Sequence, residues 1–168
     1  DIPNLDYVIL SHAHIDHTGL IPYIWKLGFR GTVFCTHATR DLCSIMLPDS
    51  GRIQETDTIQ FNKKRSKQGL PPVEPIYTME DAANAMSLFA SWPYDHEFFI
   101  EEGFSVKFID TGHMLGSSAI YISFKEGRRK RPLCYPGDVG RYNKRILPDP
   151  KPFPQADYII TESTYGDR

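Results

Sequence analysis

The chain has 168 residues, of which 40% are hydrophobic and 24% are charged, a composition typical of a folded globular domain rather than a disordered segment. Its formal net charge is −2, so the protein is not globally basic and any contact with nucleic acid would depend on local basic patches. No apolar run approaches the roughly 18 residues that a membrane helix requires, and we therefore expect no membrane partner.

The three cysteines, Cys35, Cys43 and Cys134, are odd in number and form no CxxC pair. Such a pattern predicts free, buried thiols rather than a framework of disulfides. Because free thiols are typical of a reducing compartment, we expect a cytoplasmic protein.

Hydrophobic periodicity and breakers predict the elements of the first half of the chain. The apolar run Tyr7–Leu10 and the β-branched run Thr32–Thr36 predict two strands. Residues 20–27 and 38–47 predict helices, the second of which we expect to end at Pro48.

The middle of the chain changes character before a run of strands begins. Residues 48–77 are rich in proline, lysine and arginine and predict an irregular surface excursion. Thr78 to Asp81 resembles a capping box that opens a helix through Ala90. Five later runs predict strands: 98–100, 105–109, 117–124, 133–135 and 158–160. The order favours a mixed α/β domain with helices covering a sheet.

The first predicted strand runs directly into LSHAHIDHTG (residues 10–19), where half of the six histidines of the chain gather. His12, His14, Asp16 and His17 follow HxHxDH spacing. Alternate side chains of an extended loop point to the same side, so His12 and His14 can face one point, while Asp16 and His17 face a second. Packing three imidazoles and a carboxylate on one loop without a metal would be costly in desolvation. Imidazole nitrogens with carboxylate oxygens suit zinc.

Two further candidates also follow predicted strands. His113 lies in Asp110–His113 (DTGH), and Asp138 lies in Pro136–Asp138 (PGD), where glycine lets the chain turn tightly into a loop. By contrast, His37 and His96 each lie apart from the other histidines, and we expect structural roles for both.

Six ligands are too many for one tetrahedral zinc ion but suit two ions that share a carboxylate. We expect His12, His14 and His113 to hold the first ion, and Asp16 and His17 the second. Asp138 would lie between them. A water molecule on such a centre has a lowered pKa and becomes a nucleophile, which favours hydrolysis of a phosphoester or an acyl bond.

These motifs carry a resemblance to a known family. HAHIDH, TGHMLGS and PGDVGR together resemble the metallo-β-lactamase superfamily, which implies an αβ/βα sandwich. The ending ESTYGDR resembles the junction at which the β-CASP branch of RNA-processing nucleases inserts its second domain. GLIPYIWKLGFRGTVFCT and ILPDPKPFPQADYIITESTYGDR are similar to prokaryotic relatives of the cleavage-and-polyadenylation endonuclease.

The resemblance implies a zinc-dependent ribonuclease whose six metal ligands are those inferred above. It also implies that Glu162 is the family's conserved acid, which supports a histidine of the β-CASP domain; from its position alone, Glu162 could equally cap the next turn. RNA, or single-stranded nucleic acid generally, is the implied partner, and an oligomer is compatible with the pattern. We expect residues 1–168 to form an incomplete metallo-β-lactamase domain, without its first strands, its last zinc ligand and the β-CASP domain. Little activity is then expected from these residues alone.

Two other functions stay open at this stage. One is a metallo-hydrolase of a small thioester or lactone, and the other is a catalytically silent binding subunit, although such subunits usually lose metal ligands. Basic residues in 63–67 and 125–131 indicate either phosphate contacts or a solvated turn. Ser117 and Ser118 could either donate to a phosphate or begin a strand.

Overall fold

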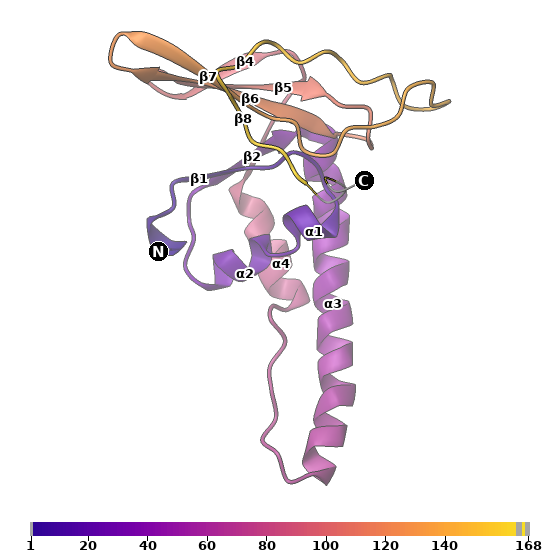
Figure 1. Cartoon of the computed structure of the whole chain (residues 1–168). Helices are drawn as coiled ribbons and strands as arrows, with labels where there is room; N and C mark the ends of the chain where they lie inside the picture. Colours follow the sequence, from indigo (N-terminus) through magenta and orange to yellow (C-terminus); the bar gives the residue numbers. More distant parts are fainter. Residues whose placement is uncertain (1, 164–165, 167–168) are drawn as a thin grey trace. The chain divides into compact units, whose positions relative to one another are not determined.

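The computed structural model describes residues 2–163 and residue 166 (Figure 1). By their contacts these residues fall into two compact units. The first unit contains the residues up to Val8, His14–Val33 and Asp41–Phe89. The second unit contains Ile9–Ala13, Phe34–Arg40 and the chain from Ala90 onward. The expected mixed α/β character is confirmed.

Three short strands form one sheet, in the order β1-β2-β3. These are β1 (Tyr7–Ile9), β2 (Thr32–Thr36) and β3 (Phe89–Trp92). The first two lie where the apolar and β-branched runs predicted them, because such side chains fit a pleated, half-buried surface. The alternation along β2 places Val33 and Cys35 fully inside.

Short helices make up much of the first unit, beginning with the 3-10 turn η1 (Ile2–Asn4), then α1 (Ile15–Thr18), α2 (Ile21–Lys26) and α4 (Met79–Ala85). The predicted capping box at α4 is present: the Asp81 backbone N–H donates to the Thr78 hydroxyl, and the Thr78 N–H donates to the Asp81 carboxylate. Together these bonds satisfy backbone donors that the first turn of a helix leaves without partners. Lys26 Nζ lies 4.0 Å from Asp81 and links α2 to α4.

The expectation that a helix ends at Pro48 is wrong. Helix α3 runs from His37 to Lys67 with Pro48 inside it, although an interior proline removes one hydrogen bond and costs about 3 kcal/mol. Tertiary contacts on both sides of the proline offset that cost. Leu47 is fully buried, and the Ser50 hydroxyl accepts a bond from the buried Tyr77.

The second half of the predicted surface excursion returns beside α3 (Figure 1). Asn62 holds this return twice, since its amide donates to the Val73 carbonyl and accepts from the Val73 N–H. Arg65 donates to the carbonyl of Pro71. The Asn62 side chain on α3 therefore satisfies backbone groups of this extended segment that no neighbouring strand or helix satisfies.

The helix predicted to reach Ala90 is shorter than expected. Helix α4 ends at Ala85, a 3-10 turn η2 follows at Met86–Leu88, and β3 begins at Phe89. The apolar pattern is ambiguous here, because a short apolar run suits a buried strand as well as a helix. Pairing of β3 with β2 decides for the strand.

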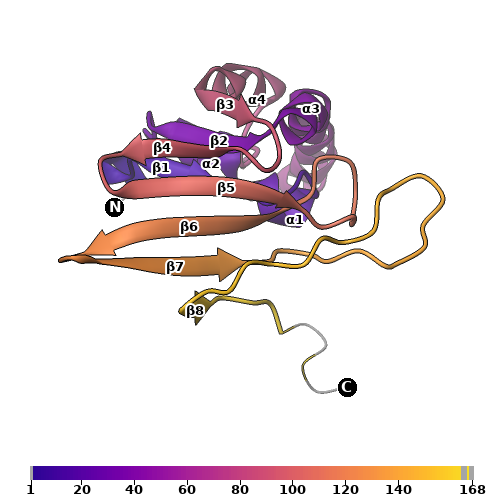
Figure 2. The same cartoon turned by 90° about the horizontal axis from the view of Figure 1, so that it is seen from above.

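The second unit is built on a five-stranded sheet in the order β4-β5-β6-β7-β8 (Figure 2). All neighbours are antiparallel except β7 and β8, which are parallel. The bounds of the strands are β4 Glu97–Glu101, β5 Phe104–Asp110, β6 Ser118–Glu126, β7 Arg129–Tyr135 and β8 Tyr158–Ile159. Each of the five strands predicted for this half is confirmed, with ends shifted by up to four residues.

Apolar side chains pack on both faces of this sheet. One face carries a cluster of four buried residues: Phe98, Val106, Phe108 and Ile120. The opposite face carries Ile109, Ala119 and Cys134. Because side chains alternate along a strand, this pattern fixes the register of β5, and with it the strand end from which the loop of His113 departs.

The basic run at 125–131 forms the hairpin between β6 and β7. Arg131 pairs within the unit, at 2.9 Å from Glu126 and 3.1 Å from Asp157. The cysteine prediction is also confirmed, since all three thiols are free and buried. Among the described residues, none of the helices combines the length and the apolar character needed to cross a bilayer.

Candidate metal centre

Three loops of the second unit meet at the ends of their strands. The first follows β1, where the Leu10 N–H donates to the Phe34 carbonyl at 2.9 Å. The Ser11 carbonyl then accepts from both the N–H and the hydroxyl of Ser118, at 2.8 and 3.0 Å. These bonds tie the residue before His12 to the start of β6.

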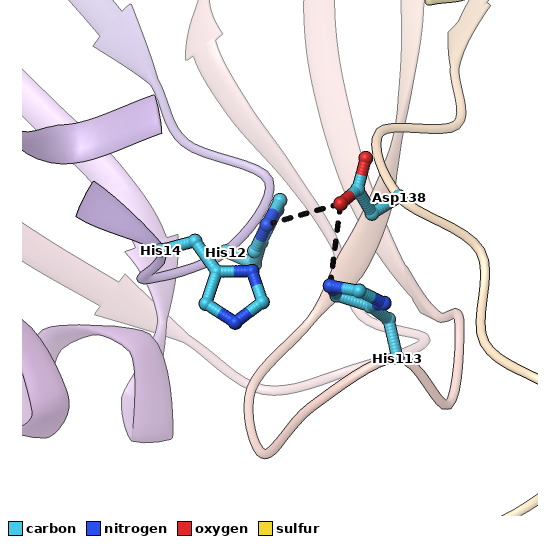
Figure 3. A group of neighbouring side chains, drawn as sticks. All are labelled: His12, His14, His113 and Asp138. Carbon is cyan, nitrogen blue, oxygen red and sulfur yellow. Dashed lines mark ion pairs between the residues drawn. The ribbon is translucent and has the colours of Figure 1, made fainter. Parts of the chain in front are cut away.

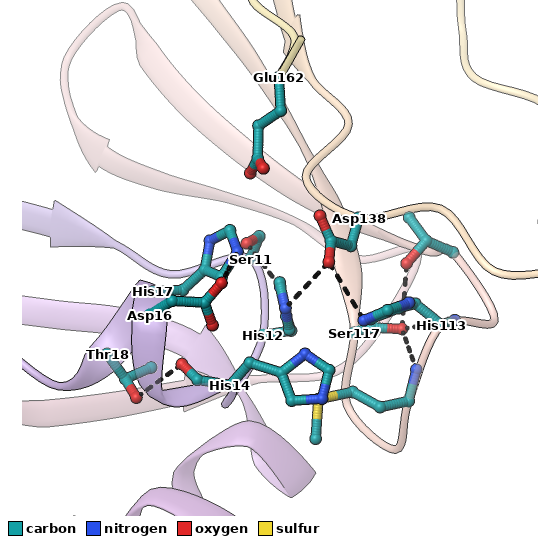
Figure 4. A network of polar contacts seen from close by, with 12 residues as sticks. Ser11, His12, His14, Asp16, His17, Thr18, His113, Ser117, Asp138 and Glu162 are labelled. Atoms are coloured by element: carbon teal, nitrogen blue, oxygen red, sulfur yellow. Dashed lines mark hydrogen bonds and ion pairs between the residues drawn. The ribbon is translucent and has the colours of Figure 1, made fainter. Parts of the chain in front are cut away.

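The second loop joins β5 to β6 and carries His113. Ser117 organises it, because its fully buried hydroxyl oxygen accepts from the backbone N–H groups of His113 and Met114 and from the Thr111 hydroxyl (Figure 4). Gly112 has a φ of +60°, a left-handed conformation that favours glycine. Of the two alternatives left open for these serines, the Ser117 hydroxyl is committed to the loop, and Ser118 begins β6.

The third loop follows β7 and carries Asp138. Gly137 before it has a φ of +56°, and the Gly140 N–H donates to the Thr111 carbonyl at 2.8 Å. Lys144 from the same loop donates its ammonium to the His113 carbonyl at 3.1 Å. The second and third loops therefore hold each other through one backbone hydrogen bond and one from the Lys144 side chain.

The side chains of these loops converge on one carboxylate oxygen. His12 Nε2 lies 3.8 Å from Asp138 Oδ2, and His113 Nε2 lies 3.3 Å from the same atom (Figure 3). The two imidazole rings meet edge to face, with centroids 5.1 Å apart. His12 is fully buried, whereas the side chains of His113 and Asp138 are 23% and 34% exposed. The group is thus anchored inside and open to solvent on one side.

This geometry fits a divalent metal ion. The 3.8 Å between His12 Nε2 and Asp138 Oδ2 is too long for a hydrogen bond, because N–H···O bonds are rarely longer than about 3.2 Å. Two ligand atoms each about 2.1 Å from a tetrahedral zinc ion lie roughly 3.4 Å apart, close to the 3.3 Å between His113 and Asp138. Ser11 Oγ lies 3.0 Å from His12 Nδ1, the second-layer contact that metal-binding histidines usually make.

The other three residues of the HxHxDH motif belong to the first unit. His14 caps α1 by its backbone: its carbonyl accepts from the N–H groups of His17 and Thr18 and from the Thr18 hydroxyl. Asp16 and His17 lie in the single turn of α1, with Asp16 Oδ2 3.6 Å from His17 Nε2. The side chain of Asp16 is 76% exposed, and that of His17 is 15% exposed.

Glu162 lies beyond β8 in the second unit. One of its carboxylate oxygens accepts a hydrogen bond from the Tyr135 hydroxyl at 2.9 Å. A carboxylate oxygen of Glu162 and one of Asp138 lie within 4.8 Å of each other, so the acid borders the cluster. The rest of the ESTYGDR motif, apart from Ser163 and Gly166, lies outside the described residues.

Two residues around the cluster were not anticipated from the sequence, Ser11 and Lys144. The position of Ser11 directly before His12 is only a weak sequence signal for a role at the site. Lys144 gives no such signal, because its carbonyl partner lies 31 residues away in the chain. The two histidines expected to be structural do make ordinary contacts: His37 bonds to Ser91 Oγ at 2.8 Å, and His96 stacks on Trp92.

Comparison with known proteins gives this geometry its context. The metallo-beta-lactamase superfamily matches residues 1–37. A subclass B3 metallo-β-lactamase from a soil metagenome library superposes with a TM-score of 0.51, at 17% identity, over 86% of this chain and 47% of that one. The chain carries part of a metallo-β-lactamase fold. The expected resemblance is therefore confirmed.

Relatives of similar sequence carry names connected with RNA. Ribonuclease TTHA0252 of Thermus thermophilus is 34% identical over all of this chain and 34% of its own length. Transcription termination factor FttA of Methanocaldococcus jannaschii is 32% identical over 98% of this chain and 24% of its own length. An RNase J-like protein of the same archaeon is 33% identical over 96% of this chain. The chain thus spans about a third or less of these relatives.

Proposed function

We propose that the chain supplies the metal centre of a zinc-dependent hydrolase that cleaves RNA phosphodiester bonds, as a metallo-β-lactamase domain of the β-CASP branch. His12, His14 and His113 would hold one ion, and Asp16 and His17 would hold a second, with Asp138 between them. RNA is the partner, and the cytoplasm is the compartment in which the free thiols stay reduced.

One observation carries this proposal: His12 and His113 each direct a ring nitrogen toward the same oxygen of Asp138 (Figure 3). Imidazole nitrogens that converge on a carboxylate oxygen are a donor set that suits zinc. The RNA-connected names of the relatives favour a phosphodiester as substrate over a small acyl compound.

When bound, zinc lowers the pKa of a coordinated water molecule toward neutrality and polarises a phosphoryl oxygen. The protein's own residues determine the geometry of this site. The buried His12 fixes the floor of the site, and the Ser117 hydroxyl holds the loop that presents His113. Glu162, held by Tyr135 at the border of the site, supports the group that protonates the leaving oxygen.

The test uses the protein at its natural length with a labelled single-stranded RNA. RNA cleavage should disappear with a chelator, return with zinc, and fall by about 10²- to 10⁴-fold in Asp138→Asn, the range typical of a catalytic group. Asp157→Asn is the matched control, because it removes a carboxylate from the same unit on the Arg131 side, away from the cluster.

Two results would replace this proposal by another. Zinc-dependent hydrolysis of a thioester or lactone without RNA cleavage would assign the centre to a small substrate. Tight RNA binding with bound zinc and no hydrolysis of either substrate would make the protein a silent binding subunit.

A further inference from the structure

Ser11, next to the candidate metal centre, has three neighbours: Ser118, His12 and Gly137. Its side chain is buried, with 3% of the residue exposed. Its carbonyl accepts a hydrogen bond from the Ser118 hydroxyl of β6, and this bond fixes the Ser11 backbone. Its hydroxyl oxygen lies 3.0 Å from Nδ1 of His12, and its Cβ and Oγ lie where a side chain at Gly137 would have to fit.

The contact with His12 decides which ring nitrogen is available. A neutral imidazole carries one proton, and the nitrogen that carries it has no lone pair to offer to a metal ion. His12 Nε2 is the atom that faces Asp138, and when this nitrogen binds the ion the proton is on Nδ1. A hydroxyl oxygen can accept from that N–H, and Ser11 Oγ lies at hydrogen-bonding distance from it.

The packing of Ser11 beside Gly137 limits the position of the Asp138 backbone. A methyl group built on Gly137 would lie 2.8 Å from Ser11 Cβ and 3.0 Å from Ser11 Oγ, so Ser11 occupies the space that a side chain at position 137 would need. Asp138 is the next residue along the chain. The Ser11 side chain therefore touches both the ring of one ligand and the backbone that carries the other.

We propose that Ser11 is a positioning residue of the metal centre: its hydroxyl holds His12 with Nε2 available to the ion, and its side chain sets the approach of the Asp138 loop. This inference rests on the metal site of the proposed function but not on the identity of the substrate. It applies equally to an RNA nuclease and to any other hydrolase built on these ligands.

The test measures zinc affinity by competition with a chromophoric chelator, together with the visible absorption of the cobalt(II) form. Ser11→Ala should lower zinc affinity about 10- to 100-fold, the usual effect of losing a second-layer partner, and should shift the cobalt bands. Ser105→Ala is the matched control. It also deletes a buried hydroxyl of the second unit, but one that donates to Glu97 rather than to a ligand, so its zinc affinity should change less than about twofold.

A second variant keeps the test decisive if Ser11→Ala does not fold. Ser11→Gly removes both the hydroxyl and the Cβ and adds no bulk, so its zinc affinity should fall at least as far as that of Ser11→Ala. Zinc affinity within twofold of the wild type in either foldable variant, while Asp138→Asn loses binding, would overturn the role of Ser11 and leave the metal centre standing. Absence of zinc binding in the wild type would overturn both. Zinc binding that depends on Ser11 without RNA cleavage would support this inference and count against the proposed function alone.

Discussion

Gly137 and Gly127 form a pair with which the packing against Ser11 can be measured. Both lie in the second unit and have left-handed backbones, with φ of +56° and +61°. A methyl group added to Gly127, in the β6–β7 turn, would meet nothing within 4 Å, whereas one added to Gly137 would meet Ser11 at 2.8 Å. Both alanine variants therefore lose stability from the left-handed backbone, but only Gly137→Ala also brings the new methyl group into steric overlap with Ser11.

The magnitudes follow from these two terms. A left-handed conformation costs an alanine about 1–2 kcal/mol relative to glycine, and overpacking adds about 1–3 kcal/mol when the neighbours cannot move. Gly127→Ala should therefore lower the free energy of unfolding by about 1–2 kcal/mol, and Gly137→Ala by about 2–5 kcal/mol. Because Asp138 follows Gly137, zinc affinity should fall only in the second variant.

Urea denaturation in the presence of a chelator measures the stability difference without any contribution from bound metal. Chelator competition on the folded proteins then measures zinc affinity. The reasoning would be refuted if the two variants lost equal stability within about 0.5 kcal/mol and bound zinc equally well. It would also be refuted if Gly127→Ala were the one that weakened zinc binding.

Three further predictions concern the cap, the thiol and the metal. Thr78→Ala should lower the free energy of unfolding by about 0.5–2 kcal/mol in urea titrations, because it leaves the Asp81 N–H without its acceptor. Burial raises the pKa of Cys43 from 9.0 to about 12. Below pH 9 the thiol is neutral in the folded and in the unfolded protein. Between pH 9 and 12 it ionises only in the unfolded chain. Stability should then fall by up to about 1.4 kcal/mol per pH unit between pH 9 and 12, a slope that urea titrations of Cys43→Ala should lack. Zinc at a hundredfold excess over its Kd should stabilise the protein by about 2.7 kcal/mol, seen as a chelator-sensitive rise in Tm that Asp138→Asn does not show.

The errors of the sequence analysis have specific causes. Proline at position 48 predicted the end of a helix from the local cost alone, whereas the buried Leu47 and the bond from Tyr77 to Ser50 keep α3 continuous. Residues 86–90 satisfied a helical pattern but joined a sheet through Phe89. In both places, contacts with residues distant in the chain outweighed the local preference.

Several features of this protein are determined by the sequence alone, because their causes are local. Apolar and β-branched runs marked the strands of the second unit, Thr78 and Asp81 marked a cap, and the HxHxDH spacing with two later strand ends marked the candidate ligands. Only the tertiary structure decided that His12 and His113 face one oxygen of Asp138, and that Ser11 Oγ lies 3.0 Å from Nδ1 of the first of these rings. Such distances depend on strand register and on glycine-permitted turns across more than a hundred residues, and no local pattern encodes them.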